Sequence, residues 1–246
     1  MMVPRPLVIL CLFALAGGQA FSQTPVASSP QARSLAGQAL QSLAGMTALS
    51  DVTIQANAYY VAGSDEETGT ASLVARGNAQ SVVTLNLSGG QRREIRNGIA
   101  GVSVAVDGTT TAMATHNCFI DSDWYFPALS LAALSSDPTQ VVSLVGQQAY
   151  DGVQVYHLVL FHNLANGQPG LAPFVQQVSA MDLYLDASSL QPVALGFNAH
   201  PDYDAGTSFP VEIRFGAYQK FQECYVEHRV YSGGVGEGLS RAVGVC

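Results

Sequence analysis

Two carboxylates stand four residues apart in the segment DLYLDASSLQPVALGF, residues 182–197, where they could form an acid/base pair. Asp182 and Asp186 lie in an alternating apolar pattern that predicts a strand, a turn and a returning strand. A strand advances about 3.3 Å per residue, so the two side chains share a face but lie about 13 Å apart. This distance is too long for sharing a proton or flanking a glycosidic bond. We therefore interpret Asp186 as a turn residue that accepts hydrogen bonds from backbone N–H groups.

Two other short segments, HNCFIDSD and HPDYD, carry side chains that can bind metal ions. The candidate ligands are His116, Cys118, Asp121, Asp123, His200, Asp202 and Asp204. The first segment shows no fourth ligand with an ordered second shell, and the second lacks the Gly and distal Glu of a calcium loop. We therefore expect polar loops and no metal site. His157 lies in an apolar alternation, which predicts a hydrogen-bonded sheet histidine rather than a base.

The sequence lacks the residues that several enzyme classes require. Its single lysine, Lys220, precedes Phe221, so a P-loop, a Ser-x-x-Lys pair and a lysine Schiff base have no carrier. No G-x-S-x-G occurs, and the loose glycine pattern at GGVGEG lies outside any βαβ unit. We expect no catalytic residues and no cofactor.

The charge balance and the apolar content restrict the partners. Lys and Arg total 10 against 18 Asp and Glu, for a net charge of −8, which disfavours binding to nucleic acid or to anionic membrane surfaces. Apolar residues make up 48% of the chain and charged residues 11%. A water-soluble protein of this composition must bury much apolar surface or keep it in a cavity.

The N-terminus has the layout of a secretory signal peptide. Arg5 precedes the apolar run LVILCLFALA, and small residues follow up to Ala20. We expect cleavage after Ala20, export to the periplasm and a flexible leader over residues 21–30. Three cysteines would then remain, enough for one disulfide and one thiol in an undetermined pairing. They are Cys118, Cys224 and Cys246.

The first half of the mature chain predicts a helix followed by hairpins. Over residues 31–46, apolar side chains recur at i, i+1, i+4, i+5 and i+8, the stripe of an amphipathic helix. From Asp51 to about Val61 the period is two, as in a strand with one packed face. The acidic loop GSDEETG follows, and turns at 77–78 and 88–90 separate further strands. We expect about five antiparallel strands here.

The middle and the second half predict a short helix and more strands. WYFPALSLAALSSDP, residues 124–138, has Pro127 near its start and Asp137-Pro138 at its end, which indicates an apolar helix or a lid. GVQVYHLVLFHN is apolar in both alternations, so that strand is central or covered on both faces. Alternating strands continue from DLYLDA to YVEHRVYS. Because no linker composition separates the two strand blocks, we expect one domain over residues 31–246.

The order of these parts resembles the periplasmic lipoprotein-carrier superfamily, the LolA/LolB-like proteins. The resemblance rests on a Leu-Asp-x-x-Ser/Thr-x-x-Pro hairpin and a following Phe-x-x-Tyr strand. The matching residues are Leu185, Asp186, Ser189, Pro192, Phe215 and Tyr218. It implies a mainly β (α+β) fold: an incomplete antiparallel β-barrel or strongly curved sheet, with an N-terminal helix and a central apolar helix acting as lid. From about residue 223 the chain departs from the family pattern, which would leave one barrel edge incomplete.

The resemblance also implies a cavity that takes a lipid or the acyl chain of a lipoprotein, and a membrane-bound protein that donates or accepts it. From the apolar alternation we expect six lining residues and three lid residues, an assignment that a one-residue slip in register would reverse. The predicted lining is Val83, Leu85, Leu195, Phe197, Ile213 and Phe215, and the predicted lid is Leu129, Leu131 and Leu134.

Three hypotheses for function follow. The leading hypothesis is an exported, non-catalytic binding protein that holds a lipid or lipoprotein acyl chain. The second is a structural or signalling module with a packed interior that binds a protein partner. The third is a secreted hydrolase with a dispersed acid/base pair. A pocket of several hundred cubic ångströms would favour the first over the second.

Overall fold

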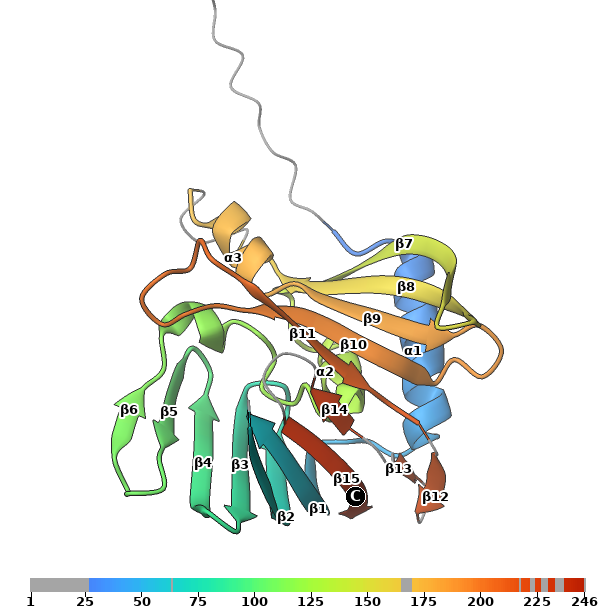
Figure 1. The fold of residues 1–246 in the computed structure, drawn as a ribbon. Helices are drawn as coiled ribbons and strands as arrows, with labels where there is room; N and C mark the ends of the chain where they lie inside the picture. The colour runs from blue at the N-terminus through green and yellow to red at the C-terminus, as the bar shows by residue number, and fades with distance from the viewer. Residues whose placement is uncertain are drawn as a thin grey trace, which may run out of the picture.

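The computed structural model describes residues 27–62, 64–164, 170–216, 218–221, 224–226, 230–232 and 237–245, with side chains up to Tyr218. These residues form one antiparallel sheet of 13 strands, in the order β6-β5-β4-β3-β2-β1-β15-β14-β11-β10-β9-β8-β7, and a separate pair, β12-β13. The sheet bends until its two halves face each other (Figure 1). Its end strands β6 and β7 are not paired to each other in the described part of the chain. The predicted mainly β fold with a strongly curved, incompletely closed sheet is confirmed.

Consecutive hairpins build the first half of the sheet, which we call the first wall. Its strands are β1 (Asp51–Ala62), β2 (Asp65–Arg76), β3 (Gln80–Leu87), β4 (Gly90–Asn97), β5 (Ala100–Val104) and β6 (Thr110–Ala112). Gly77 and Gly98 occupy the left-handed region at φ 55° and 60° in two of the connecting turns. The predicted helix-then-hairpins order is confirmed, but the acidic loop is wrong in part, because Asp65 already begins β2 and the hairpin is tighter than expected.

The second half of the sheet, the second wall, also consists of consecutive antiparallel strands. They are β7 (Gln140–Tyr150), β8 (Val153–His162), β9 (Met181–Asp186), β10 (Pro192–Ala199) and β11 (Phe209–Arg214). Asp186 accepts hydrogen bonds from the N–H groups of Ser188 (2.9 Å) and Ser189 (2.7 Å), so the predicted turn role is confirmed. The hydroxyl of Ser188 also donates to Asp186, and this hydrogen bond, followed by the one from the N–H of Ser189, keeps the pKa of Asp186 below its ordinary value.

Four strands lie in the C-terminal part: β12 (Gln219–Phe221), β13 (Cys224–Val226), β14 (Val230–Ser232) and β15 (Glu237–Val245). β14 and β15 join the two walls, and β12 and β13 form the separate pair. β15 pairs with β1 from Thr53↔Val245 to Tyr60↔Glu237, and β14 pairs with β11 at Ile213↔Ser232. The expectation that this divergent part leaves one barrel edge incomplete is therefore wrong: its strands close the gap between the walls, and the open edges are β6 and β7.

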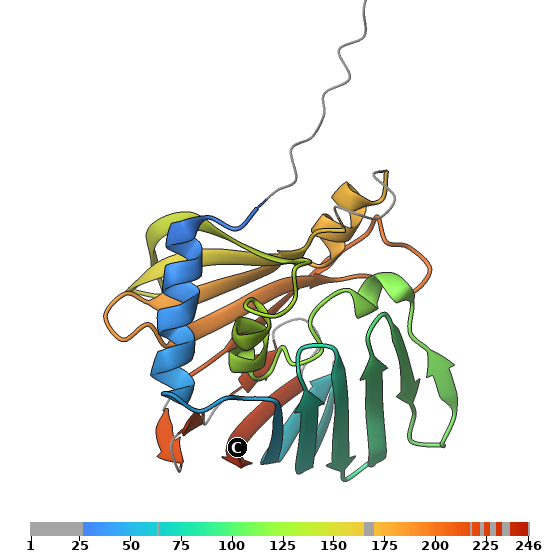
Figure 2. The ribbon, with the colours of Figure 1, turned by 180° about the vertical axis from the view of Figure 1, so that it is seen from behind.

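Three α-helices and one 3-10 helix complete the described part of the chain. They are α1 (Pro30–Ala44), η1 (Thr115–Cys118), α2 (Pro127–Ala133) and α3 (Ala172–Val178). α1 stands beside the walls and α2 lies between them (Figure 2). Ser29 caps α1 by accepting from the N–H of Ala32 at 3.1 Å, and its own N–H donates to Val142 of β7 at 3.3 Å. The last residues of the predicted leader are thus held against the second wall, whereas residues 1–26 lie outside the described chain.

The interior around α2 is closely packed. Leu129 and Leu131 are 1% and 3% exposed and contact a core that includes Leu73 of the first wall and Leu183 of the second. The predicted apolar helix is present, and it fills the space between the walls. No helix in the described ranges is long and apolar enough to cross a membrane.

The residues that carry the family resemblance meet in space. The hydroxyl of Tyr218 donates to the carbonyl of Pro192 at 2.8 Å, and the N–H of Phe215 donates to Val193 at 3.0 Å. The segment after β11 is thereby tied to the hairpin between β9 and β10. The two sequence strings form one structural unit at this edge of the second wall.

Candidate functional site

Two adjoining cavities lie next to the packed core, and we call them together the chamber. The larger has a volume of about 630 Å³ and lies over β3, β4 and β5, and the smaller, about 320 Å³, lies between β4 and the strands β10 and β11. Glu94 and Trp124 line both. Small-molecule sites usually occupy about 300–1,000 Å³, so the chamber has the size of a ligand site.

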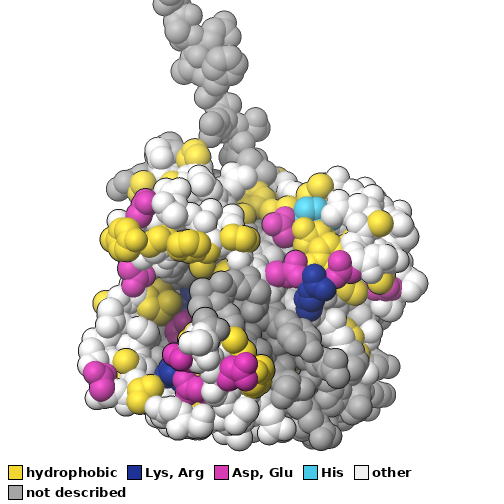
Figure 3. Space-filling view, viewed as in Figure 1, with side chains coloured by type: hydrophobic (Ala, Val, Ile, Leu, Met, Phe, Trp, Pro, Cys, Tyr) yellow, Lys and Arg dark blue, Asp and Glu magenta, His cyan; other side chains and the backbone are white. Residues whose placement is uncertain are grey.

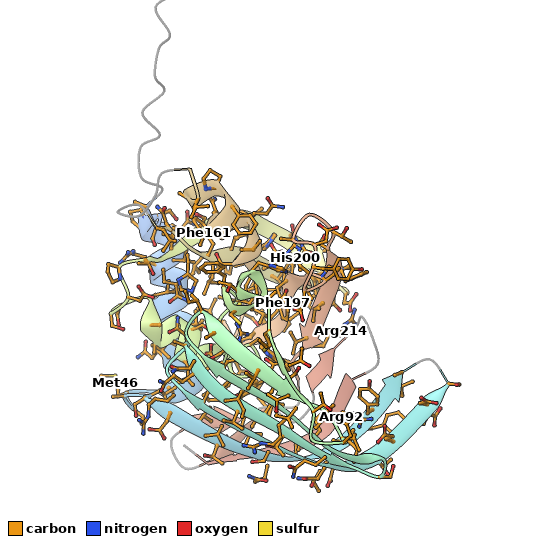
Figure 4. The ribbon with its side chains drawn as sticks, turned by 90° about the vertical axis from the view of Figure 1, so that its left-hand side faces the viewer. Met46, Arg92, Phe161, Phe197, His200 and Arg214 are labelled. Atoms are coloured by element: carbon orange, nitrogen blue, oxygen red, sulfur yellow. The ribbon has the colours of Figure 1, made fainter. Side chains whose placement is uncertain are left out.

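One side of the chamber is apolar. Val83 and Leu85 of β3 line the larger cavity, and Phe197 of β10 and Val211 of β11 line the smaller one. Each is partly buried and packs against the core. Figure 4 places Phe197 on the wall opposite Arg92, so the apolar lining comes from both walls.

The other predicted residues lie in the packed interior. Leu195, Ile213 and Phe215 are 2%, 0% and 7% exposed, and none of them lines either cavity of the chamber. The predicted lid residues Leu129, Leu131 and Leu134 are likewise buried in the core. The structure therefore brings Val83 and Leu85 together at one cavity and Phe197 at the next, and separates them from the remaining six. Whether α2 acts as a lid stays a prediction.

A row of charged side chains on β4 faces the inside of the first wall. Arg92, Glu94 and Arg96 alternate along the strand and lie opposite Leu85, Val83 and Ser81 of β3. Arg96 is 4% exposed, and its Nη2 donates to the carbonyls of Ile120 (2.7 Å) and Asn117 (3.0 Å). The buried guanidinium of Arg96 thus holds the segment between β6 and β7, residues 113–139, which we call the wall-to-wall segment.

Arg92 lines the larger cavity near the turn between β3 and β4. Its guanidinium donates to both carboxylate oxygens of Glu67, at 2.6 Å and 3.1 Å, and lies 5.0 Å from the ring centre of Tyr60. The hydrogen bond from Arg92 keeps the pKa of Glu67 below its ordinary value, although burial opposes this. The pair is a bidentate contact with both charges satisfied.

Glu94 differs from its neighbours because its carboxylate makes no hydrogen bond or ion pair with any described residue. Burial raises the pKa of Glu94, and the charge of Arg96 opposes this shift only in part. An ionised carboxylate in such a place is costly without a partner. The junction of the two cavities therefore contains a hydrogen-bond acceptor that no described residue uses.

A set of hydrogen bonds, which we call the clasp, joins the walls beside the smaller cavity. Asn117 donates to the carbonyl of His200 at 2.8 Å and accepts from its N–H at 3.0 Å, as a paired strand would. His116 donates from Nε2 to Pro201 at 3.0 Å, and Asp202 accepts from Asn117 at 3.1 Å. Several candidate ligands of the sequence analysis are therefore used to hold the loop between β10 and β11.

Asp121 is the centre of a second buried network. It accepts from Gln140 Nε2 (2.6 Å), His162 Nε2 (2.8 Å) and Asn78 Nδ2 (3.1 Å). Burial lowers the pKa of His162, but the hydrogen bond and charge of Asp121 outweigh it, so the pKa of His162 is raised overall. Asp121 thereby fixes the wall-to-wall segment against both β7 and β8.

Asp123 holds the first turn of α2. It is fully buried and accepts from the N–H (2.7 Å) and the hydroxyl (2.8 Å) of Ser130. Burial, and then the charge of Asp121, raise the pKa of Asp123 well above its ordinary value. In the described ranges no group of three or more His, Cys, Asp and Glu is placed to hold a metal ion.

We expect the protein to be less stable at pH 8 than at pH 5.5. Unfolded chains lose an Asp proton near pH 4 and a His proton near pH 6.5. The folded state keeps both protons to higher pH, because the pKa values of Asp123 and His162 are raised, so stability falls as pH rises through these windows. Thermal unfolding followed by circular dichroism measures the difference.

Asp123→Asn is neutral at both pH values, so its free energy of unfolding is expected to fall less than that of the wild type between pH 5.5 and pH 8. If the fall is smaller by about 1 kcal/mol, the drop in Tm should be smaller by about 2–4 °C. Asp65→Asn, at an exposed position on β2, is the matched control and should follow the wild type. Equal pH dependence in the wild type and Asp123→Asn would contradict this assignment.

The remaining candidates for chemistry have structural partners. Asp182 lies 2.6 Å from Nε2 of His157 on the outside of the second wall, so the predicted role of His157 as a hydrogen-bonded sheet histidine is confirmed. Cys118 is a free, buried thiol whose pKa is raised by burial. The side chains of Cys224 and Cys246 lie outside the described residues, so the disulfide stays a prediction.

The outside of the first wall carries an apolar row across five strands. The register aligns Val74, Val82, Ile95, Val102 and Ala112 from β2 to β6. Val74 is 41% exposed. We call these five residues the outer row.

The fold is an open, curved antiparallel sheet whose two walls face each other, with one helix between the walls and another beside them. This is the fold of LolA superfamily proteins. No protein-family model matches the sequence. Comparison with curated proteins gives no match either.

Three solved structures show the similarity. A LolA superfamily protein from Nitrosomonas europaea aligns with a TM-score of 0.53 and 13% identity over 86% of this chain and 91% of its own. A putative outer membrane lipoprotein-sorting protein domain from Vibrio parahaemolyticus gives 0.51 and 10%, over 87% and 92%. A DUF1329 family protein from Desulfovibrio piger gives 0.53 and 11%, over 89% and 92%. At these identities the likeness establishes the fold.

Glu94 and Trp124, which line both cavities, are among the chamber residues that the sequence analysis missed. The signal for Glu94 was the alternation R-x-E-x-R in QRREIRNG, directly after the turn at 88–90. That turn pairs β4 with β3, so the charged alternation shares a face with Val83 and Leu85. Trp124 is the first residue of the segment 124–138 that was predicted as an apolar helix or a lid, but the prediction gave it no lining role; in the structure the helix begins only at Pro127.

Proposed function

We propose that this protein is an exported, non-catalytic binding protein that holds the acyl chain of a lipid or lipoprotein in the chamber. The chamber carries this proposal, because it combines a ligand-sized volume with apolar side chains from both walls. Burial is worth about 0.8 kcal/mol per CH₂, or roughly 10 kcal/mol for a dozen methylenes before the cost of association. The similarity in fold to the putative outer membrane lipoprotein-sorting protein domain from Vibrio parahaemolyticus agrees with this function.

The side chains that could act in catalysis support a role without chemistry. Asp121 and Asp123 are committed to hydrogen bonds that fix the fold, and burial favours the neutral thiol of Cys118. Delivery would need a membrane-bound donor or acceptor protein, and the net charge of −8 opposes binding to nucleic acid. The signal peptide over residues 1–20 is the basis for placing the protein in the periplasm.

Native mass spectrometry with lipid extraction tests the proposal on protein purified from an exporting host. We expect a co-purified acyl species that is released by denaturation. Repeated absence of such a species, together with no binding of dodecanol, would exclude the proposed function.

A matched pair of variants locates the binding site. Val83→Asp places a charge in the larger cavity, whereas Val82→Asp places it on the outer row of the same strand. We expect Val83→Asp to weaken dodecanol binding about tenfold or more, which corresponds to about 1.4 kcal/mol, and Val82→Asp to change it less than about twofold. Titration followed by the fluorescence of Trp124 measures both.

A module that binds a protein partner is the second candidate. The outer row favours it, because an apolar row across five strands on an outside face is typical of a contact surface. In that case Val82→Asp would abolish the complex and Val83→Asp would not, the reverse of the pattern expected for chamber binding.

A further inference from the structure

The chamber contains an acceptor without a donor, and this restricts the chemistry of its ligand. Glu94 lines both cavities and has no hydrogen-bond or ion-pair partner in the described part of the chain. On the same face of β4, Arg92 is engaged with Glu67, and Arg96 with the carbonyls of Asn117 and Ile120. Arg93 also lines the larger cavity, but it alternates to the opposite face of the strand and is exposed. A ligand group beside Glu94 would therefore meet a carboxyl group whose oxygens have no hydrogen-bond partner among the described residues.

Trp124 is the second group at the same junction. It is partly buried against the core and lines both cavities. An indole face attracts cations, and attraction is strongest where water is excluded. A carboxylate and an indole at one place are the pair of groups that recognises an ammonium ion.

Building on the proposed function, we infer that the ligand is a single-chain amphiphile whose head carries an ammonium group. The ammonium group lies between Glu94 and Trp124, and the chain lies against Val83 and Leu85. The ammonium provides the donor that Glu94 lacks and offsets the cost of its partly buried charge.

The charge of the whole protein agrees with a cationic head. The net charge is −8, and Figure 3 shows acidic side chains distributed over one face with few basic ones. Such a field attracts cations and repels anions. The larger cavity itself is lined by two carboxylates, Glu94 and Asp107, and by two arginines, of which Arg92 is paired with Glu67 and Arg93 is exposed. A hydrogen bond from the N–H of Thr109 keeps the pKa of Asp107 below its ordinary value.

The test uses three probes with the same twelve-carbon chain: dodecylammonium, dodecanol and dodecanoate, each below its micelle concentration. The sequence contains one tryptophan, Trp124, so intrinsic fluorescence reports directly on the chamber. We expect dodecylammonium to bind about tenfold more tightly than dodecanol, a difference of about 1.4 kcal/mol, and dodecanoate to bind most weakly.

Two variants separate the contribution of Glu94 from that of the overall charge. Glu94→Gln is expected to reduce the preference for dodecylammonium to within about twofold of dodecanol. Glu66→Gln removes the same charge at an exposed position of β2 that lines neither cavity, and should keep the preference. An equal loss in both variants would assign the preference to net charge and overturn the inference.

The outcomes distinguish the two proposals. Equal binding of dodecylammonium and dodecanol by the wild type would overturn the ammonium site and leave the acyl-binding function standing. Failure of all three probes to bind would overturn both. Because the wild type alone decides these cases, the result holds even if Glu94→Gln fails to fold.

A second arm uses lipids of equal chain length. Lysophosphatidylethanolamine and lysophosphatidylglycerol share a chain and a phosphate, but only the first has an ammonium group. Native mass spectrometry of competing mixtures is expected to show the ethanolamine lipid bound in excess by the wild type and not by Glu94→Gln. An excess of the glycerol lipid would overturn the inference.

Discussion

Replacing Leu129 by alanine is expected to lower the free energy of unfolding by about 2–5 kcal/mol. Leu129 is 1% exposed on α2, between walls that are joined through β14 and β15 and through the clasp. Walls held in this way cannot collapse onto the space left by the missing side chain, so the cost includes an unfilled cavity. Urea unfolding followed by circular dichroism measures the change.

Leu171→Ala is the matched control, because Leu171 is 48% exposed before α3. Its effect should remain within about 0.5 kcal/mol, as for most surface substitutions. A loss below about 1 kcal/mol for Leu129→Ala would contradict the prediction, since core leucine truncations cost more than this. It would indicate that α2 leaves the interior easily, as a lid does.

Replacing Arg96 by methionine is expected to have the second large effect on the free energy of unfolding. The substitution keeps an apolar stem but removes the donors to the carbonyls of Asn117 and Ile120. A buried acceptor left without a donor costs about 1–3 kcal/mol, so we expect the free energy of unfolding to fall by at least about 2 kcal/mol. The same urea experiment measures it.

Arg93→Met on the same strand is the control, because Arg93 is exposed. Its stability should change by less than about 0.5 kcal/mol. Arg96→Lys should recover only part of the loss, because an ammonium lacks the planar donor geometry of the guanidinium. Equal stability of Arg96→Met and Arg93→Met would refute the role assigned to Arg96.

The sequence predicted those parts of the fold in which periodicity coincides with burial. The helix at α1 and the alternation of β1 were correct because one face of each is packed. Alternation also placed Leu185 and Leu195 inside the second wall, where they are 0% and 2% exposed. Turn residues fixed the register, so the correct faces followed.

Elements with mixed patterns were missed. β7 carries small and polar residues after Leu144, α3 is a single short helix in a Gly/Pro-rich region, and β6 is only three residues long. Val106 lies beyond β5, which ends at Val104, and lines the larger cavity. Short elements are defined by their neighbours rather than by their own periodicity.

The site was predicted less well than the fold because apolarity alone does not separate lining from core. Leu195 and Phe197 share a strand face, yet the first is packed and the second lines a cavity. The difference arises from what lies opposite each residue, which depends on the closure of the two walls. Glu94 shows the reverse case. A charged residue at an inward-facing position of a strand indicates a cavity rather than a packed core, but the sequence analysis did not draw this conclusion.

The pairing of β15 with β1 also affects the order in which the protein folds. Each wall consists of neighbouring hairpins, whose contacts are local and form quickly, whereas Thr53 and Val245 are far apart in sequence. Bringing them together requires closure of a long loop, which is slow and costly in entropy. Until that step the edge of β1 is unpaired and can pair with another chain. An emerging chain therefore carries its greatest risk of aggregation between completion of the first wall and arrival of its last strand.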